Sequence, residues 1–357
     1  MDTTTAEETI QQIFVYLYSL LFIFGMIGNI LAYSVFSSKR FKKLSFSIYF
    51  RTLTLTDSLT LFNVFRKILL FKYLIDLKQN SQFLCSTVYF ISYAVPPISS
   101  WILGIISLDR MVNILRPTDF VFRNRKSFQI MLCSSIIVFN FILYLPILIY
   151  SKLETITETV NQTTSNSSWV YNVSFDSCSL PDKISVYLDW MDLLNSTLAP
   201  FVLMILCTTI TIRFLFKSRI KTKASRICSK NSSVHYTLTS TNSTYHNENN
   251  QNNSIIIHNH QNQNQTQHAI SSRDTKFAIT SIALNLFFFI FNCPIVLHGL
   301  LSNYLNLDDL IKFAVITITS FVYYLNFATI FYINILVNSI FKVEFYSIFF
   351  SCSKKAT

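Results

Sequence analysis

Long apolar segments separated by short polar ones dominate the pattern along this chain. The apolar segments cover roughly 12–36, 46–71, 82–115, 128–150, 186–216, 275–300 and 308–334. Each has about the 20 residues that a helix needs to cross a bilayer. We therefore expect seven membrane helices within a bundle over 12–336, preceded by a short outer segment over 1–11 and followed by a tail over 337–357.

The composition supports a membrane protein. Hydrophobic residues make up 51% of the chain and charged residues only 13%, about half the share in soluble domains. The net charge of +11 raises the question of nucleic acid, but the basic residues gather in short segments between apolar ones, as cytoplasmic loops do. We therefore expect contact with membrane lipid and none with nucleic acid.

The basic residues also indicate the topology, because they follow the first, third and fifth apolar segments. They are Lys39, Arg40, Lys42 and Lys43, then Arg116, Arg123, Arg125 and Lys126, then Lys217, Arg219, Lys221, Lys223 and Arg226. The positive-inside rule places these loops in the cytoplasm and the N-terminus outside. Residues 1–12 lack the basic leader of a signal peptide, so we expect the first apolar segment to direct insertion.

Two connecting segments have a distinct composition. The outer segment 151–183 contains three glycosylation acceptors, Asn161, Asn166 and Asn172. The cytoplasmic segment 217–273 includes a tract rich in Asn, Gln, Ser and His over 228–270. Such a tract has too few apolar residues to form a core, so we expect a disordered loop.

The tail begins with a short amphipathic pattern. Phe341, Phe345 and Phe349 recur at four-residue spacing, which places one apolar stripe on a helix lying in the membrane interface. Cys352, followed by two lysines, is a candidate for palmitoylation.

Two ionisable features stand out within the apolar segments. Asp57 lies in the middle of the second segment, where an ionisable side chain is costly and by default functional. The third segment has no charge between Cys85 and the adjoining pair Asp109-Arg110. Such a pair at the membrane boundary can retain water while it packs against neighbouring helices.

Together with several motifs, these features resemble the rhodopsin-like G-protein-coupled receptors. The motifs are Gly28-Asn29, Leu53-Thr-Leu-Thr-Asp57, Asp109-Arg110-Met111, Pro200 and Pro294, with Cys85 standing 25 residues before Arg110. The resemblance covers nearly the whole chain except 228–270. It implies an all-α membrane protein, a seven-transmembrane helix bundle with a short amphipathic eighth helix and its N-terminus outside.

The resemblance also implies a switch and two hinges. Asp109 would hold Arg110 in the resting state, and Asp274 would offer a second acidic partner until the sixth helix moves and exposes Arg110 to a G protein. The alternative is an ordinary ion pair worth ~1 kcal/mol or less. Pro200 and Pro294 would kink the fifth and sixth helices.

By the same resemblance, Asn29, Ser99 and Asn326 would surround Asp57 in an oxygen-lined site for Na⁺ and water. The alternative is a polar network that only ties helices together. Ile330 replaces one customary neighbour of this site. The family also implies a disulfide between Cys85 and Cys178, which would fix the outer loop over the mouth of the bundle. No cofactor other than this Na⁺ is expected.

Several positions depart from the family pattern. Asn292 stands at the sixth-helix position that is normally tryptophan, and Ile330 to Asn334 lacks the usual proline and tyrosine of the seventh helix. Pro96-Pro97 in the third helix is also unusual and is expected to distort that helix.

Charges near the outer ends suggest the kind of ligand. Ser92 occupies the position where amine receptors carry aspartate, which argues against a small aminergic ligand. The candidate pocket residues are Arg66, Lys67, Ser92, Asp189, Asp192, Asn292 and His298. Opposed basic and acidic groups would suit a short peptide, unless the Arg and Lys side chains only extend to the interface.

We therefore expect a plasma-membrane receptor that couples an extracellular ligand, a neuropeptide, to heterotrimeric G proteins, with an overall likeness to invertebrate neuropeptide receptors. No nucleophile–base pair, phosphate loop or metal motif indicates an enzyme. One alternative is a chemosensory receptor of the same fold for small molecules. Another is a seven-helix channel or transporter, but the internal repeats typical of transporters are not found.

Overall fold

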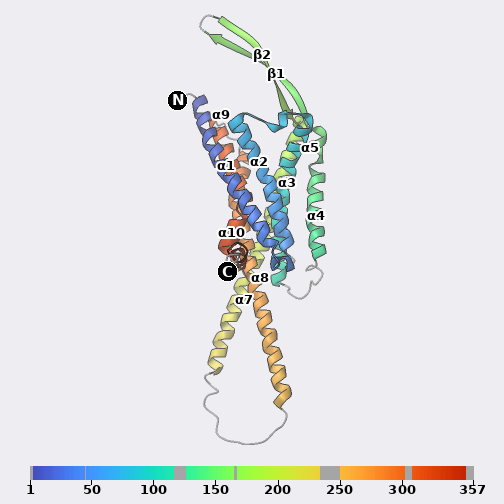
Figure 1. Ribbon diagram of the computed structural model, residues 1–357, viewed down its shortest axis with the longest axis vertical. Coiled ribbons are helices and arrows are strands. Elements are labelled where there is room, and N and C mark those ends of the chain that lie inside the picture. Colours follow the sequence, from blue (N-terminus) through green and yellow to red (C-terminus); the bar gives the residue numbers. More distant parts are fainter. Residues whose placement is uncertain are drawn as a thin grey trace, which may run out of the picture.

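The protein is a bundle of long helices with a β-hairpin projecting from one end (Figure 1). The computed structural model describes residues 3–44, 46–115, 126–164, 167–233, 250–301 and 308–350. The helices are α1 (Thr3–Phe36), α2 (Ser47–Tyr73), α3 (Gln82–Leu115), α4 (Lys126–Leu143), α5 (Leu145–Tyr150), α6 (Asp182–Asp192), α7 (Ala199–Ser233), α8 (Asn250–Leu301), α9 (Asp309–Leu325), α10 (Ile330–Val337) and α11 (Ser339–Phe349). The N-terminus lies at the hairpin end, and α10 and the extended parts of α7 and α8 lie toward the opposite end (Figure 1).

Among the described residues, six segments are long and apolar enough to cross a membrane. They are Thr5–Phe36, Gln82–Leu115, Lys126–Tyr150, Lys183–Lys217, Thr275–Leu301 and Asp309–Ala328. The expected second span corresponds to α2, which is equally long but carries Arg51, Asp57, Arg66, Lys67 and Lys72. These five charges explain why α2 is not among the six, although it packs closely against α1 and α3.

The helix boundaries differ from expectation at the N-terminus. The segment 1–11 was expected to precede the first helix, but α1 already begins at Thr3. Ala6, Glu7, Glu8 and Gln11 are good helix formers, so helical hydrogen bonding extends past the apolar residues.

Three of the long segments are interrupted. Tyr144 separates α4 from α5 just before Pro146, a π-helical turn over Leu193–Leu198 separates α6 from α7 just before Pro200, and a 3₁₀ turn over Asn326–Ala328 separates α9 from α10. Proline removes a helical hydrogen bond and crowds the preceding turn, which accounts for the first two interruptions.

The paired prolines of α3 do not interrupt that helix. Pro96 and Pro97 are both buried within a continuous α-helical segment from Gln82 to Leu115, so the expected distortion produces no break. Pro294 likewise lies inside α8. Prolines are tolerated in membrane helices because neighbouring groups satisfy the freed carbonyls.

The hairpin at one end was not predicted. Strands β1 (Lys152–Thr164) and β2 (Ser167–Ser179) pair antiparallel, with Leu153 opposite Cys178. A disulfide joins Cys178 to the fully buried Cys85 near the start of α3, which confirms the expected pairing. Asn161 lies on β1 and Asn172 on β2, whereas Asn166 lies outside the described residues.

The segment expected to be a disordered loop is partly helical. Helix α7 continues to Ser233 and α8 begins at Asn250, so helical backbone covers 217–233 and 250–273. Both helices extend beyond the bundle (Figure 1). Extending an existing helix adds one hydrogen bond for each residue fixed, without a new nucleation cost, which explains how polar residues join it.

Close packing of α1 depends on a glycine. A Cβ atom on Gly25 would lie 2.7 Å from Leu61 Cδ1 and 2.9 Å from Ala328 Cβ. Small residues at helix contacts let backbones approach closely in membrane bundles. Gly25 therefore sets how near α1 can lie to α2 and to the turn before α10.

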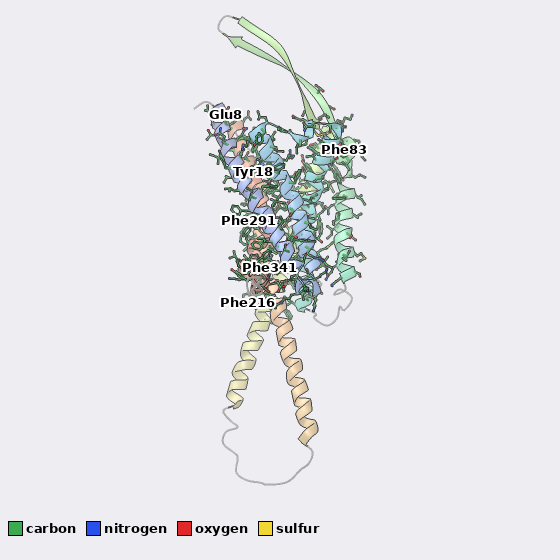
Figure 2. The ribbon with its side chains drawn as sticks, in the orientation of Figure 1. Glu8, Tyr18, Phe83, Phe216, Phe291 and Phe341 are labelled. Atoms are coloured by element: carbon green, nitrogen blue, oxygen red, sulfur yellow. A yellow bond between two sulfur atoms is a disulfide. The ribbon has the colours of Figure 1, made fainter. Side chains whose placement is uncertain are left out.

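The core at the end opposite the hairpin is rich in phenylalanine. Phe36, Phe41 and Phe341 are fully buried there, and Figure 2 places Phe341 in this half and Tyr18 nearer the hairpin. Asn338 precedes α11 as its N-cap, and its side-chain oxygen accepts hydrogen bonds from the backbone N–H of Ile340 (3.1 Å) and of Phe341 (3.2 Å). This N-cap fixes where α11 turns away from α10.

Candidate functional site

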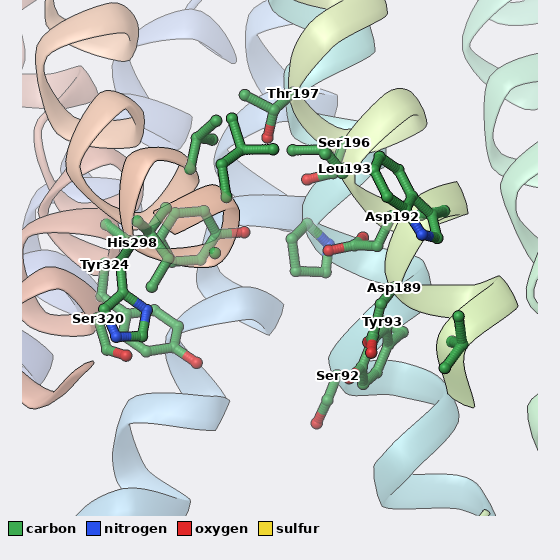
Figure 3. A pocket seen from close by; sticks show the side chains of 18 residues that line it. Ser92, Tyr93, Asp189, Asp192, Leu193, Ser196, Thr197, His298, Ser320 and Tyr324 are labelled. Atoms are coloured by element: carbon green, nitrogen blue, oxygen red, sulfur yellow. The ribbon is translucent and has the colours of Figure 1, made fainter. Parts of the chain in front are cut away.

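A cavity of about 680 Å³ opens within the hairpin half of the bundle. It lies between α3, the α6–α7 segment, α8 and α9 (Figure 3). The polar and ionisable residues on its walls are Ser92, Tyr93, Asp189, Trp190, Asp192, Ser196, Thr197, His298, Ser320, Tyr323 and Tyr324. The volume lies within the range of small-molecule sites.

Four of the seven predicted pocket residues line this cavity: Ser92, Asp189, Asp192 and His298. Ser92 does not project freely, because its hydroxyl donates a hydrogen bond to Asn63 Oδ1 at 2.6 Å. Asn292 is buried (2% exposed), and its amide donates to the carbonyl oxygen of Phe288 at 2.8 Å within α8. Asn292 is therefore not part of the lining.

Arg66 and Lys67 also lie outside the lining, although the sequence suggested a basic wall. Arg66 Nη1 is 3.8 Å from Asp76 Oδ1. The ammonium of Lys67 lies 5.5 Å from the ring centroids of both Tyr18 and Tyr324. These contacts hold both cations against α1, α9 and the loop that follows α2, outside the cavity walls.

A third cation at this end is Lys78, in the loop between α2 and α3. Its ammonium lies 4.8 Å from the ring centroid of Tyr89. Burial and the nearby Arg66 lower the pKa of Lys78, against the opposing effect of Asp76. Lys78 is likewise absent from the cavity walls.

A buried polar network supports Asp192 from behind. The hydroxyl of Tyr144, itself fully buried, donates to Asp192 Oδ1 at 2.9 Å. Asn195 Nδ2 donates to Asn140 Oδ1 at 2.8 Å and approaches the Tyr144 hydroxyl at 3.5 Å. Trp101 Nε1 donates to Asn195 Oδ1 at 2.9 Å, so the network joins α3, α4 and the π-helical turn.

Sequence reasoning missed Asn140, Tyr144 and Asn195. Asn140 and Asn195 each stand inside an apolar segment, where amides are rare and hydrogen-bond across helices. The sequence therefore indicates that these amides form hydrogen bonds between helices, but it does not indicate with which residues.

The predicted polar site in the middle of the bundle is buried. Asp57 is 4% exposed and lies close to Ser99. The Ser99 hydroxyl donates to Thr56 Oγ1 at 2.8 Å. Asn29 Nδ2 donates to the carbonyl oxygen of Phe327 at 3.1 Å.

The chemistry of this region fits a hard cation. The carboxylate of Asp57 and the hydroxyl of Ser99 offer oxygen atoms as ligands, and Asn29 Oδ1 is a buried oxygen without a hydrogen-bond partner among the described residues. Asn326 lies in the 3₁₀ turn after α9. Oxygen-only donor sets suit hard cations, so these residue types fit the predicted Na⁺ site, which remains a prediction. The alternative, a polar network that only ties the helices together, involves the same residues.

At the opposite end, the predicted switch pair is present. Asp109 and Arg110 form a salt bridge, and both side chains are buried. Asn113 Nδ2 donates to Asp109 Oδ2 at 2.9 Å. Asp274 lies in α8, but its side chain is outside the described ones, so its predicted contact with Arg110 remains a prediction.

An aromatic ring covers Arg110. Its guanidinium carbon lies 4.6 Å from the ring centroid of Phe46. The centroids of Phe46 and Phe277 are 4.3 Å apart, and those of Phe41 and Phe277 are 6.1 Å apart. Phe277 belongs to α8, so these rings join Arg110 to the helix that the family mechanism would move. No local sequence pattern predicts this contact.

A polar cluster ties α3, α7 and α8 together one turn from Arg110. Ser107 Oγ donates to Asn285 Oδ1 at 3.0 Å, and Asn285 Nδ2 donates to Thr208 Oγ1 at 2.8 Å. Ser107 Oγ also lies 3.3 Å from Ser281 Oγ. These bonds hold α8 against its neighbours just above the switch pair.

Two remaining predictions concern the hinges and the tail. Pro200 lies directly after the π-helical turn, and Pro294 lies within α8, whose lining residues Ile295 and His298 follow it. Cys352 lies outside the described residues, so palmitoylation remains a prediction.

Comparison with known proteins extends these observations. The family model described as "7 transmembrane receptor (rhodopsin family)" matches residues 28–329. Proteins named probable G-protein coupled receptor 34 are 33% identical over 114 residues in Pan troglodytes and in Gorilla gorilla gorilla, and 32% identical in Mus musculus. These alignments cover 31% of this chain and 29% of each relative.

Proposed function

Because the chain belongs to the rhodopsin family of seven-transmembrane receptors, we propose that it couples binding of an extracellular peptide, of the neuropeptide type, to activation of heterotrimeric G proteins at the plasma membrane. Membership in the family shows a multi-pass membrane receptor, and the family implies the extracellular ligand and the G protein that we propose as its partners. The peptide nature of the ligand and the productive coupling are our proposals.

One observation carries the proposal: a ligand-sized cavity and a buried acid–arginine pair occupy opposite ends of one bundle. The cavity lies toward the hairpin, and Asp109-Arg110 lies near the other end of α3. Because α3 and α8 contribute to both regions, a change at the cavity has a physical route to Arg110. A ligand that binds one packing of these helices better than another shifts the equilibrium between them.

The proposed topology places the hairpin outside. The disulfide at the hairpin end favours an oxidising compartment, and Lys39, Arg40, Lys42 and Lys43 gather at the opposite end, where the positive-inside rule expects the cytoplasm. In this topology α2 is the remaining span of seven, α11 is an eighth helix at the cytoplasmic surface, and Asn161, Asn166 and Asn172 are available for glycosylation. Asp57, Asn29, Ser99 and Asn326 would hold an allosteric Na⁺.

A second candidate is a chemosensory receptor of the same fold for small molecules. The cavity volume of about 680 Å³ is the observation that favours it, since it matches small-molecule sites. The projecting hairpin favours a peptide instead, because it adds contact surface beyond the cavity (Figure 1).

The test is G-protein activation in cells that express this chain with a promiscuous Gα subunit. Fractionated peptide extract from the source organism is applied, and Arg110→Ala at equal surface expression is the control. A response that requires Arg110 and disappears when the extract is treated with protease supports the proposal. A response that survives protease favours the chemosensory candidate, and a response that Arg110→Ala leaves unchanged contradicts the coupling mechanism.

A further inference from the structure

We infer that the cavity selects cationic groups, that the carboxylate of Asp192 is their anchor, and that Tyr144 positions this carboxylate. The inference deepens the proposed function and rests on it, because it names the class of ligand: one that presents an amine or a guanidinium to the α6–α7 wall.

The charge of the cavity walls is one-sided. Asp189 and Asp192 line the cavity, and no lysine or arginine of the described chain does so. The nearby cations have other contacts: Arg66 pairs with Asp76, and Lys67 lies between the rings of Tyr18 and Tyr324. A cavity that is lined by carboxylates, while the nearby cations contact other groups, carries a negative potential. This potential attracts cations and repels anions.

The geometry of Asp192 leaves one oxygen available. Its Oδ1 accepts the hydrogen bond from Tyr144 at 2.9 Å, and within the described part of the chain its Oδ2 has no hydrogen-bond partner. Figure 3 shows the carboxylate directed from the α6 backbone toward the cavity and Asp189 lying beside Tyr93. A carboxylate in a poorly hydrated setting gains most from a charged donor, because charge-assisted hydrogen bonds are roughly twice as strong as neutral ones.

Tyr144 fixes where this carboxylate points. Its ring is fully buried beneath Ala94, Ile147 and Leu188, and its hydroxyl lies next to the Asn195–Asn140 amide pair. A side chain held by packing and by a second layer of hydrogen bonds keeps a binding group in a single orientation. The network thus acts on the ligand through Asp192 and does not contact it.

The test measures the potential of the cavity with two probes of opposite charge. A thiol is introduced by Thr197→Cys on the cavity wall, in a Cys293→Ser background that removes the half-buried native cysteine. Cells are treated from outside with the trimethylammonium or the sulfonate form of ethyl methanethiosulfonate. The rate at which each probe reacts with the thiol is followed by the loss of later maleimide labelling. The ratio of the two rates is then divided by the same ratio for a simple thiol in solution.

We expect a normalised cation-to-anion ratio above ~10, because a carboxylate on the cavity wall attracts the trimethylammonium probe and repels the sulfonate probe. Asp192→Asn should lower the ratio at least ~3-fold, Tyr144→Phe should lower it less, and Asp192→Glu should restore it. The matched control is Asp309→Asn, which removes the same charge from a fully exposed side chain at the same end and should leave the ratio unchanged.

A ratio near 1, or one that Asp309→Asn lowers as much as Asp192→Asn does, overturns the inference. If Asp192→Asn fails to reach the surface, Tyr144→Phe and Asp189→Asn supply the comparison, and an unchanged ratio in both also overturns it. These rates need no G protein, so a cation preference without any G-protein response defeats the proposed function alone. A peptide response that Asp192→Asn leaves unchanged at equal surface expression defeats the inference alone.

Discussion

The two ends of this bundle are built in opposite ways. The hairpin end contains a polar cavity of about 680 Å³ with two carboxylates on its wall. The other end is filled by aromatic rings: Phe36 stacks on Phe50 with centroids 4.6 Å apart, and Phe46 lies over Arg110 and packs against Phe277. The hairpin end provides space for a ligand, whereas no cavity of ligand size is found among the described residues of the other end.

This difference indicates which event costs free energy. A ligand can enter the hairpin end with little rearrangement, because its cavity already exists. At the other end, exposing Arg110 requires separating buried rings, and aromatic pairs contribute ~0.5–1.5 kcal/mol each beyond their buried area. In the proposed function, this structure is the resting arrangement, and ligand binding would have to offset the cost of opening the aromatic end.

The largest expected effect comes from removing the arginine that the aromatic end covers. Arg110→Ala should abolish G-protein activation at every ligand concentration, because no guanidinium remains to meet the G protein. By contrast, Asp192→Asn at the hairpin end should only raise the ligand concentration required. Concentration–response curves at matched surface expression distinguish a lost maximum from a shifted midpoint. Equal curve shapes for the two variants would remove the functional distinction between the ends.

The next largest effect concerns the anchoring of the hairpin. Cys178→Ser breaks the disulfide to Cys85 and frees the strand that it ties to α3. We expect surface delivery or ligand binding to fall several-fold, because removing a native disulfide typically costs ~2–5 kcal/mol. Flow cytometry of an epitope tag on intact cells measures delivery. The double variant Cys85→Ser/Cys178→Ser should resemble the single one, and normal behaviour in either would contradict a structural role for the bond.

A smaller effect, of opposite sign, is expected at the aromatic end. Phe46→Leu keeps apolar volume but removes the ring between Arg110 and Phe277. A partly desolvated cation–π contact is worth ~1–2 kcal/mol, and its loss favours the open arrangement. We expect ligand-independent G-protein activation to rise ~3–10-fold.

The matched control for that variant is Phe345→Leu. Phe345 belongs to the same aromatic region but packs on Phe331 and Phe349 rather than on Arg110 or α8. Phe345→Leu should change ligand-independent G-protein activation by no more than about twofold. If both variants raise basal activity equally, general loosening of the core explains the effect and the specific contact over Arg110 does not.

Local patterns in the sequence predicted much of the fold, because length and apolarity alone decide whether a segment can span a membrane. The segment 82–115 coincides with α3 to the residue. Hydropathy alone does not identify α2 as a membrane span, because its five charges offset its apolar residues. The hairpin at Lys152–Ser179 was not predicted, because glycosylation acceptors such as Asn161 and Asn172 indicate an exposed segment and no particular secondary structure.

The candidate site was predictable only in part, because contacts between distant segments leave little trace in one sequence. The Cys85–Cys178 pairing came from the spacing that the family shares. The network of Tyr144, Asn195 and Trp101 depends on how α4 meets the π-helical turn, which no local pattern specifies. The same holds for Phe46, whose ring meets Arg110 across 64 positions of chain.

The smallest expected effect tests whether Lys67 belongs to the ligand cavity at all. Its ammonium lies 5.5 Å from two tyrosine ring centroids, and within the described residues no carboxylate pairs with it. Removing water from such a charge costs free energy that two cation–π contacts only partly offset. Met has a similar length and makes favourable contacts with aromatic rings, so Lys67→Met should leave the thermal unfolding midpoint of the purified receptor unchanged or slightly raised.

The matched variant is Arg66→Met, which breaks the contact with Asp76 at 3.8 Å and should lower the midpoint, since a partly exposed pair is worth ~1 kcal/mol or less. Lys67→Met should also keep the peptide response within about threefold, because its side chain does not line the cavity. A lost response with an unchanged midpoint would show that Lys67 contacts the ligand. The hairpin end would then carry both charges, and its cavity would no longer be the one-sided acidic space that distinguishes it from the aromatic end.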